Sequence, residues 1–221
     1  ERLARLDTLF QSYVREGRTP GVVALVARHG EVVWSGAFGM ADREAARPMR
    51  PDALFRIASQ SKAVTSVAAM ILVEEGRLRL DEPVSRYIPN FATARVAVTT
   101  DSGRVLVPVR RAVTIRQLLT QTAGLSYGTE SLIRDDYRAA GLGPAAGHGW
   151  YLADKAEPIC ATMDRLGTLP LAAQPGEAWI YGYATDVLGC VVERASGVPL
   201  DRFFQQRIFG PLQMRDSWFF P

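Results

Sequence analysis

Ser59 and Lys62 stand three residues apart, at the point where an apolar helical pattern begins. Residues at this spacing are neighbours on one face of a helix. An amine in that position could take the proton of the serine hydroxyl while the hydroxyl attacks a carbonyl carbon. The spacing therefore predicts a nucleophile with its base attached.

The composition gives this lysine extra weight, because the 26 basic residues include only two lysines, Lys62 and Lys155. Arginine stays protonated at any working pH, whereas burial or a neighbouring cation can move a lysine amine toward neutrality. Chance still matters, since with eleven serines a match to this spacing occurs in about one such sequence in ten. The pair needs a second, independent part of a site.

Tyr181 is the candidate for that second part. It follows the turn at Pro175-Gly176 and precedes a helical pattern that ends at Gly197, so its phenol could be presented at the edge of a site. Only about one aromatic residue in five in such a place is catalytic, and the others pack into the core. The sequence position alone leaves both interpretations open.

Ser126 is the rival nucleophile, because residues 124–128 match the Gly-x-Ser-x-Gly pattern of a nucleophile elbow. An elbow needs a strand before the serine and a helix after it, whereas here a helical pattern comes first and a glycine-rich loop follows. A triad would also need a histidine base. The chain has only His29, in an expected hairpin turn, and His148, in the glycine-rich loop. A loop serine is therefore the preferred interpretation.

The start of the chain reads as one helix and one hairpin. Apolar spacing predicts an amphipathic helix over residues 2–16 with one buried stripe. Two β-rich runs at 21–28 and 31–39 predict a hairpin that turns at His29-Gly30. Two strands alone are marginal in water, so further strands are expected outside this sequence.

Two later signals concern the middle of the chain. A second, smaller hairpin around Asp101-Ser102-Gly103 is expected on the surface. Thr114 followed by Gln117 is a capping box that begins another helix. No strand candidate follows residue 113, which is a further reason to expect that the sequence is part of a longer chain.

The composition argues against several classes of partner. With 48% apolar and 22% charged residues, the 221 residues are typical of a globular chain. The net charge of +3 is spread without a basic patch, so no nucleic acid and no anionic membrane is expected as a partner. No apolar run approaches a membrane span, and no ligand set for a metal is present, so we expect no cofactor.

Cys160 and Cys190 lack the spacing of a metal site or a redox pair, so two separate buried thiols are expected rather than a disulfide. Free thiols fit a reducing compartment, which makes the cytoplasm the expected location. The periplasm is the alternative, because the sequence begins at Glu1 and its native N-terminus is expected to be missing.

Three motifs, in this order and spacing, resemble the serine β-lactamase-like superfamily and, within it, the family VIII carboxylesterases. They are Ser59-Gln60-Ser61-Lys62, the segment 114–125, and the segment 175–181 running into 185–189. The resemblance implies that Ser59 is the acylated nucleophile and that Lys62 and Tyr181 act together as its general base. A phenol titrates near pH 10, but a neighbouring ammonium favours its phenolate, so the two groups could act as one coupled base.

The resemblance implies hydrolysis of a small-molecule carboxylic ester through an acyl-enzyme. A β-lactamase, a D-amino-acid peptidase or an acyltransferase would use the same residues, and a non-catalytic peptide-binding relative is the alternative from another class. Class C β-lactamases carry asparagine two places after the tyrosine, where this chain has Tyr183, which suits an esterase better. Gln121 replaces a histidine that is common in its helix, which looks structural. Tyr127 and Tyr183 are candidates to line the acyl pocket, with packing as an equal alternative.

The implied fold is α+β, an antiparallel sheet flanked by helices with a mostly helical region inserted between its strands and the site at the junction. Residues 1–48 would form the first helix and hairpin of the sheet region. Residues 49–197 would form the helical region that carries the site, and residues 198–221 would return toward the sheet. A later strand with the second oxyanion donor and a third motif is expected outside these 221 residues.

Overall fold

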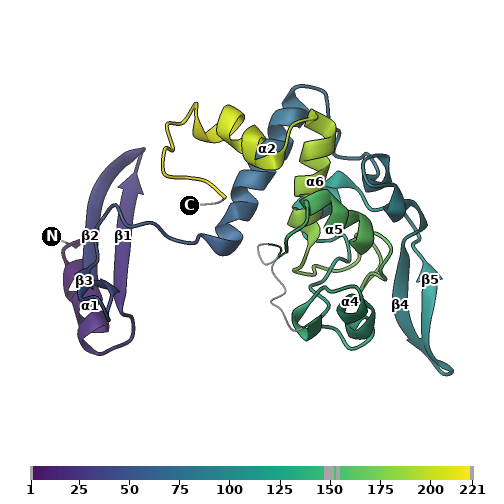
Figure 1. The fold of residues 1–221 in the computed structure, drawn as a ribbon, viewed down its shortest axis with the longest axis horizontal. Coiled ribbons are helices and arrows are strands. Elements are labelled where there is room, and N and C mark those ends of the chain that lie inside the picture. The colour runs from purple at the N-terminus through teal and green to yellow at the C-terminus, as the bar shows by residue number, and fades with distance from the viewer. Residues whose placement is uncertain (1, 147–151, 153–154, 220–221) are drawn as a thin grey trace. The chain divides into compact units, whose positions relative to one another are not determined.

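The structure is a computed structural model that describes residues 2–146, 152 and 155–219. It divides into two units, one of residues 1–57 and one of residues 58–221. Both units combine helices with antiparallel strands (Figure 1), which confirms the α+β class expected from the sequence. Among the described residues, no helix combines the length and the apolar character needed to cross a bilayer.

The first unit is built on a three-stranded antiparallel sheet in the order β1-β2-β3. Its strands are β1 (Gly21–Arg28), β2 (Glu31–Asp42) and β3 (Arg47–Pro48). The expected turn between β1 and β2 is confirmed, because His29 and Gly30 both have positive φ, at 53° and 82°. Two residues of this conformation give a turn whose twist matches that of the strands beside it.

Helix α1 (Arg5–Arg15) packs on this sheet through aromatic side chains. The ring of Phe10 lies 5.9 Å from that of Trp34 and 5.7 Å from that of Phe38, between centroids. The expectation of a buried stripe is wrong, since no residue of α1 is buried and its inward side chains are only half-buried. One helix on three strands shields too little area to bury its apolar face completely.

The buried core lies in the second unit, where every fully buried residue among the described ones is found. Its central element is α6 (Ala184–Ser196), which lies beside α2 (Ser61–Glu74) (Figure 1). The same helix contacts α3 (Ile115–Leu119), α5 (Ile159–Leu166) and α7 (Leu200–Phe204). The segment that carries Tyr181 therefore leads directly into the best-packed helix of the unit.

Short elements connect these helices. They are the 3-10 turns η1 (Ala58–Gln60), η2 (Val84–Arg86), η3 (Pro89–Thr93) and η4 (Pro144–Ala146), helix α4 (Arg134–Ala139) and the π-helical turn η6 (Gln205–Phe209).

The start of α3 and the end of α6 are formed by residues typical of helix ends. At the start of α3, the Thr114 hydroxyl accepts from the Gln117 N–H at 3.4 Å, and the Gln117 side chain accepts from the Thr114 N–H at 2.9 Å. This confirms the predicted capping box. Helix α6 ends at Gly197, whose φ of 71° is the left-handed conformation common after a helix.

The second hairpin, β4 (Arg95–Thr100) with β5 (Gly103–Pro108), forms as predicted, but it is only partly on the surface. Val96 and Ala97 are buried near the base of β4. The Ala97 N–H donates to the carbonyl oxygen of Leu171 at 3.0 Å, which attaches the base of the hairpin to the core. The strand ends near the turn are exposed, as are Arg95 and Pro108 at the other end of the hairpin.

Cys160 and Cys190 form a disulfide, so the expectation of two separate thiols is wrong. Their Cα atoms lie 5.0 Å apart because α5 packs against α6, and this distance is within the reach of a disulfide. Spacing along the sequence could not show the approach, since it depends on how two helices cross. The bond also removes the support that free thiols gave to a reducing compartment.

Candidate active site

Ser59 lies in the exposed 3-10 turn η1, directly before α2. The residue before it, Ala58, has a φ of 43°, in the left-handed region that residues with a Cβ rarely adopt. Such a conformation costs about 1–3 kcal/mol, and strained residues of this kind cluster at functional sites. The turn presents the Ser59 hydroxyl one helical turn ahead of Lys62.

The Lys62 amine contacts three groups. It donates hydrogen bonds to the Ser59 hydroxyl at 3.2 Å and to the Tyr127 hydroxyl at 3.3 Å. It also lies 4.6 Å from the centroid of the Tyr181 ring, a distance at which a cation is attracted to an aromatic face. These contacts hold the half-buried amine against the candidate nucleophile.

Tyr181 completes the cluster from a segment more than a hundred residues later. Its hydroxyl donates to the Ser59 Oγ at 2.5 Å. Its ring is 40% exposed, stacks on Trp179 at 5.9 Å and meets Tyr127 edge-on at 5.7 Å, between centroids. The structure thus brings together the three residues that the sequence singled out.

The pKa values of the Lys62 amine and the Tyr181 phenol shift in opposite directions. Hydrogen bonding with Lys62 and, to a smaller extent, with Ser59 lowers the pKa of Tyr181 below the ordinary value of a phenol. Burial alone would lower the pKa of Lys62, but its interactions with Tyr181 and Tyr127 together outweigh burial and raise it. The direction is opposite to the shift toward neutrality that a lysine acting alone as base would need. The phenol is the group moved toward deprotonation.

The loop that presents Tyr181 lies against the Gly-x-Ser-x-Gly segment. A Cβ at Gly182 would come within 2.4 Å of the Leu125 carbonyl oxygen and 2.5 Å of the Ser126 Cα, both of them backbone atoms. Only glycine permits an approach this close. The segment that resembles a nucleophile elbow therefore serves as a support behind Tyr181.

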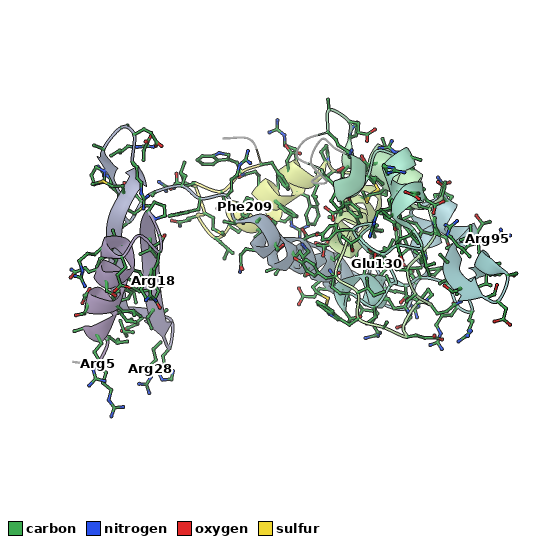
Figure 2. The ribbon with its side chains drawn as sticks, turned by 90° about the horizontal axis from the view of Figure 1, so that it is seen from below. Arg5, Arg18, Arg28, Arg95, Glu130 and Phe209 are labelled. Carbon is green, nitrogen blue, oxygen red and sulfur yellow. A yellow bond between two sulfur atoms is a disulfide. The ribbon has the colours of Figure 1, made fainter. Side chains whose placement is uncertain are left out.

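Ser126 itself is fully buried. Its hydroxyl donates to the carboxylate of Glu130, which lies in the second unit (Figure 2), and accepts from the Gly128 N–H at 2.9 Å. The described part of residues 58–221 contains no histidine, because His29 is in the hairpin turn of the first unit and His148 falls outside the residues that the structure describes. The interpretation of Ser126 as a loop serine is confirmed.

The two other tyrosines differ in position. Tyr127 is half-buried and reaches Lys62, as described above. Tyr183 is 1% exposed, accepts from the Gly143 N–H at 3.1 Å, and packs against Tyr127 and Tyr137 at 4.8 and 6.4 Å between centroids. Burial raises the pKa of Tyr183 to about 12. This position favours the packing alternative for Tyr183 over direct contact with a substrate.

Asp186 is a charged group that no sequence pattern singled out as functional. It lies in the first turn of α6, and burial raises the pKa of its carboxyl to about 6, while the charge of Lys62 lowers it. Its negative charge in turn contributes to the raised pKa of Tyr127. Its connection with the candidate site is visible only in the structure, where its charge interacts with Lys62 and Tyr127.

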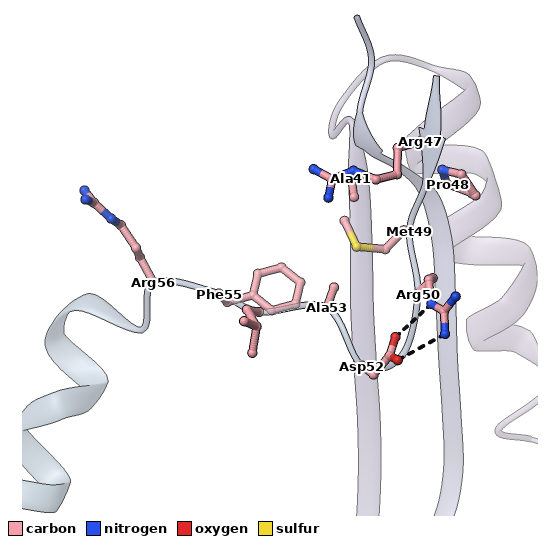
Figure 3. A pocket seen from close by; sticks show the side chains of 10 residues that line it. Ala41, Arg47, Pro48, Met49, Arg50, Asp52, Ala53, Phe55 and Arg56 are labelled. Atoms are coloured by element: carbon pink, nitrogen blue, oxygen red, sulfur yellow. Dashed lines mark hydrogen bonds and ion pairs between the residues drawn. The ribbon is translucent and has the colours of Figure 1, made fainter. Parts of the chain in front are cut away.

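A separate hollow of about 550 Å³ lies in the first unit (Figure 3). Arg50 and Asp52 form a paired hydrogen bond there, at 3.0 and 3.1 Å. No candidate site residue lines this hollow. Within the described residues, no group of three or more His, Cys, Asp or Glu side chains could hold a metal ion.

Comparisons with known proteins show the family of the chain. The family model described as Beta-lactamase matches residues 6–221. Esterase EstB of Burkholderia gladioli is 42% identical over 216 residues, which cover 98% of this chain and 51% of EstB. Among solved structures, EstCE1, described as a hydrolase with promiscuous acyltransferase activity, has a TM-score of 0.79 and 35% identity, covering 95% of this chain and 51% of EstCE1.

Simvastatin synthase, LovD, from Aspergillus terreus has a TM-score of 0.76 and 29% identity, covering 96% of this chain and 52% of LovD. The chain spans about half the length of these relatives. The family match over almost the whole chain agrees with the three motifs and with the fold. The chain therefore belongs to the serine β-lactamase-like superfamily, near its esterases.

Proposed function

We propose that the full-length protein is a serine hydrolase that cleaves carboxylic esters of small molecules through an acyl-enzyme on Ser59. One observation carries the proposal: the Ser59 hydroxyl is bound both by the Tyr181 phenol at 2.5 Å and by the Lys62 amine at 3.2 Å. A hydroxyl held in this way has a base beside it and a cation next to that base. The similarity to proteins named as esterases supports an ester as the substrate.

In the first half-reaction, the deprotonated Tyr181 accepts the proton of Ser59 while the serine Oγ forms a bond to the ester carbonyl carbon. Negative charge develops on the carbonyl oxygen, and the backbone N–H of Ser59 is proposed as one donor to it. The bond to the alcohol oxygen then breaks, and the alcohol leaves with the proton from Tyr181. Lys62 stays protonated and stabilises the phenolate at the start and end of this transfer.

In the second half-reaction, a water molecule replaces the alcohol. Tyr181 takes a proton from the water as its oxygen attacks the acyl carbon, and the proton passes back to Ser59 as the acyl-enzyme bond breaks. The products are a carboxylic acid and the free enzyme. An alcohol in place of water would give acyl transfer, which the similarity to EstCE1 and LovD favours as the second candidate function.

Lactam hydrolysis is the less favoured alternative on the same three residues. The amide that class C β-lactamases place two positions after the tyrosine is absent, and Tyr183 at this position is buried. A panel of short p-nitrophenyl esters and a chromogenic cephalosporin distinguishes the two activities. Turnover of the cephalosporin without ester cleavage would overturn the esterase assignment.

The assignment of the nucleophile is tested by labelling the full-length protein with a fluorophosphonate and locating the adduct by mass spectrometry. We expect the label on Ser59, and we expect Ser59→Ala to lower ester turnover by about 10³-fold or more. Tyr181→Phe should lower it by about 10²–10⁴-fold, because it removes the base. Ser126→Ala is the control and should still take the label on Ser59. A label on Ser126, or none anywhere, would refute the proposal.

A further inference from the structure

We propose that Gln121 is a positioning residue for catalysis, which holds the Tyr181 loop so that the phenol stays within hydrogen-bonding distance of Ser59. The inference rests on the proposed function. It concerns a residue that touches neither the nucleophile nor the amine.

Gln121 occupies a position at which helices usually end with glycine. Its N–H donates to the Leu118 carbonyl oxygen at 3.3 Å, and the Thr122 N–H donates to the Gln117 carbonyl oxygen at 2.9 Å. This pair of bonds is the Schellman motif that closes a helix, and its central residue is left-handed. Gln121 has a φ of 57°, which glycine adopts freely and glutamine does not. Gln121 therefore holds a strained backbone conformation at the end of α3.

The polar groups of Gln121 bind the loop on both sides of Tyr181. Its backbone carbonyl accepts from the Ile180 N–H at 2.8 Å. Its side-chain carbonyl accepts from the Gly182 N–H at 3.3 Å, and its side-chain amide donates to the Thr185 hydroxyl at 3.0 Å. One residue therefore fixes the position before the phenol, the position after it and the first turn of α6.

The other contacts described for the Tyr181 loop do not hold it in every direction. Gly182 packs against the backbone at Leu125 and Ser126, which blocks movement in one direction only. The Tyr181 ring is 40% exposed. A displacement of about 1 Å in a catalytic group can lower a rate by about 100-fold, so small freedom in this loop matters.

Two variants of the full-length protein remove the side-chain bonds in different ways. Gln121→Leu keeps the approximate volume without polar groups. Gln121→Gly relaxes the left-handed backbone while it keeps the backbone bond to Ile180. We expect both to lower kcat by about 10- to 100-fold with a much smaller change in KM. We expect labelling of Ser59 by a fluorophosphonate to slow in parallel.

The pH profile provides a readout that a purely structural role would not move. Lys62 lowers the pKa of Tyr181 by a hydrogen bond, so a phenol that drifts from the amine regains a higher pKa. The profile of kcat/KM in both variants should therefore shift toward alkaline pH. The melting temperature of Gln121→Gly should not fall below that of the wild type, because glycine suits this backbone.

Gln213 supplies a matched control, since it is also a glutamine in the left-handed region, at a φ of 55°, and is exposed. Gln213→Leu and Gln213→Gly should leave turnover unchanged. Wild-type kcat and pH profile in both Gln121 variants, with Ser59→Ala inactive, would overturn the positioning role alone. Loss of turnover in Gln121→Leu but not in Gln121→Gly would also overturn it, by assigning the effect to the bulk of leucine. Full activity of Ser59→Ala would overturn the proposed function and this inference together.

Discussion

Replacing Gly182 with alanine should move Tyr181 away from Ser59. The added Cβ would lie 2.4 Å from the Leu125 carbonyl oxygen and 2.5 Å from the Ser126 Cα. Ordinary contact begins at 3.4 Å, so the two backbone segments must separate by about 1 Å. Neither neighbour is the flexible end of a side chain. The separation therefore falls on the loop that carries the phenol.

This displacement has a cost in stability and a larger one in rate. Overpacking a well-packed site by one methyl group costs about 1–3 kcal/mol. A shift of about 1 Å in the proton acceptor lowers turnover by about 100-fold. The Tyr181 hydroxyl oxygen and the Ser59 Oγ are 2.5 Å apart, so this shift would lengthen their hydrogen bond beyond the usual O–H···O distance.

The assay compares Gly182→Ala with Gly189→Ala in the full-length protein, by ester turnover, fluorophosphonate labelling and urea denaturation. Gly189 lies within α6, and a Cβ there would meet only the ends of the Leu200 and Ile159 side chains, at 3.0 and 3.2 Å. Alanine also favours a helix by about 1 kcal/mol over glycine, which offsets the tight contact. We expect nearly unchanged activity in this control. Wild-type turnover in Gly182→Ala, or equal losses in both variants, would refute the reasoning.

Two further predictions concern stability. Burial raises the pKa of Asp186 to about 6, so its contribution to folding stability is fully present below about pH 4 and is lost as the pH rises through 6. Asp186→Asn should raise the free energy of unfolding by about 3 kcal/mol at pH 8 and leave it unchanged at pH 4, and an equal difference from the wild type at both pH values would contradict this. Replacing Cys160 and Cys190 by serine should lower the free energy of unfolding by about 3–4 kcal/mol, because the disulfide spans a sequence separation of 30. Identical melting temperatures for the wild type and the serine variant would refute it.

Local chemistry was enough to predict several elements. The turn at His29-Gly30 and the capping box of Thr114 and Gln117 depend on residues a few positions apart, and both form as predicted. The choice of Ser59 over Ser126 also rested on local context, namely which elements precede and follow each serine. In the structure Ser126 is a buried loop residue, as expected of it, and the role of Ser59 stays a prediction.

Features set by contacts distant in sequence could not be predicted in this way. The disulfide between Cys160 and Cys190 requires α5 and α6 to pack together at these two residues. The hydroxyl of the buried Tyr183 accepts a hydrogen bond from Gly143, forty residues earlier. The raised pKa of Lys62 results from burial, which lowers it, and from two phenols in other parts of the chain, which raise it more. Because these phenols are distant in sequence, the residue type alone suggested a lowered pKa.

The division of the chain into two units has a consequence for the candidate site. Ser59, Lys62 and Tyr181 all belong to the unit of residues 58–221, so the distances along the proton-transfer path are internal to one packed body. The geometry of these three residues is thus a property of one unit, and no atom along the proposed path belongs to the sheet of residues 1–57.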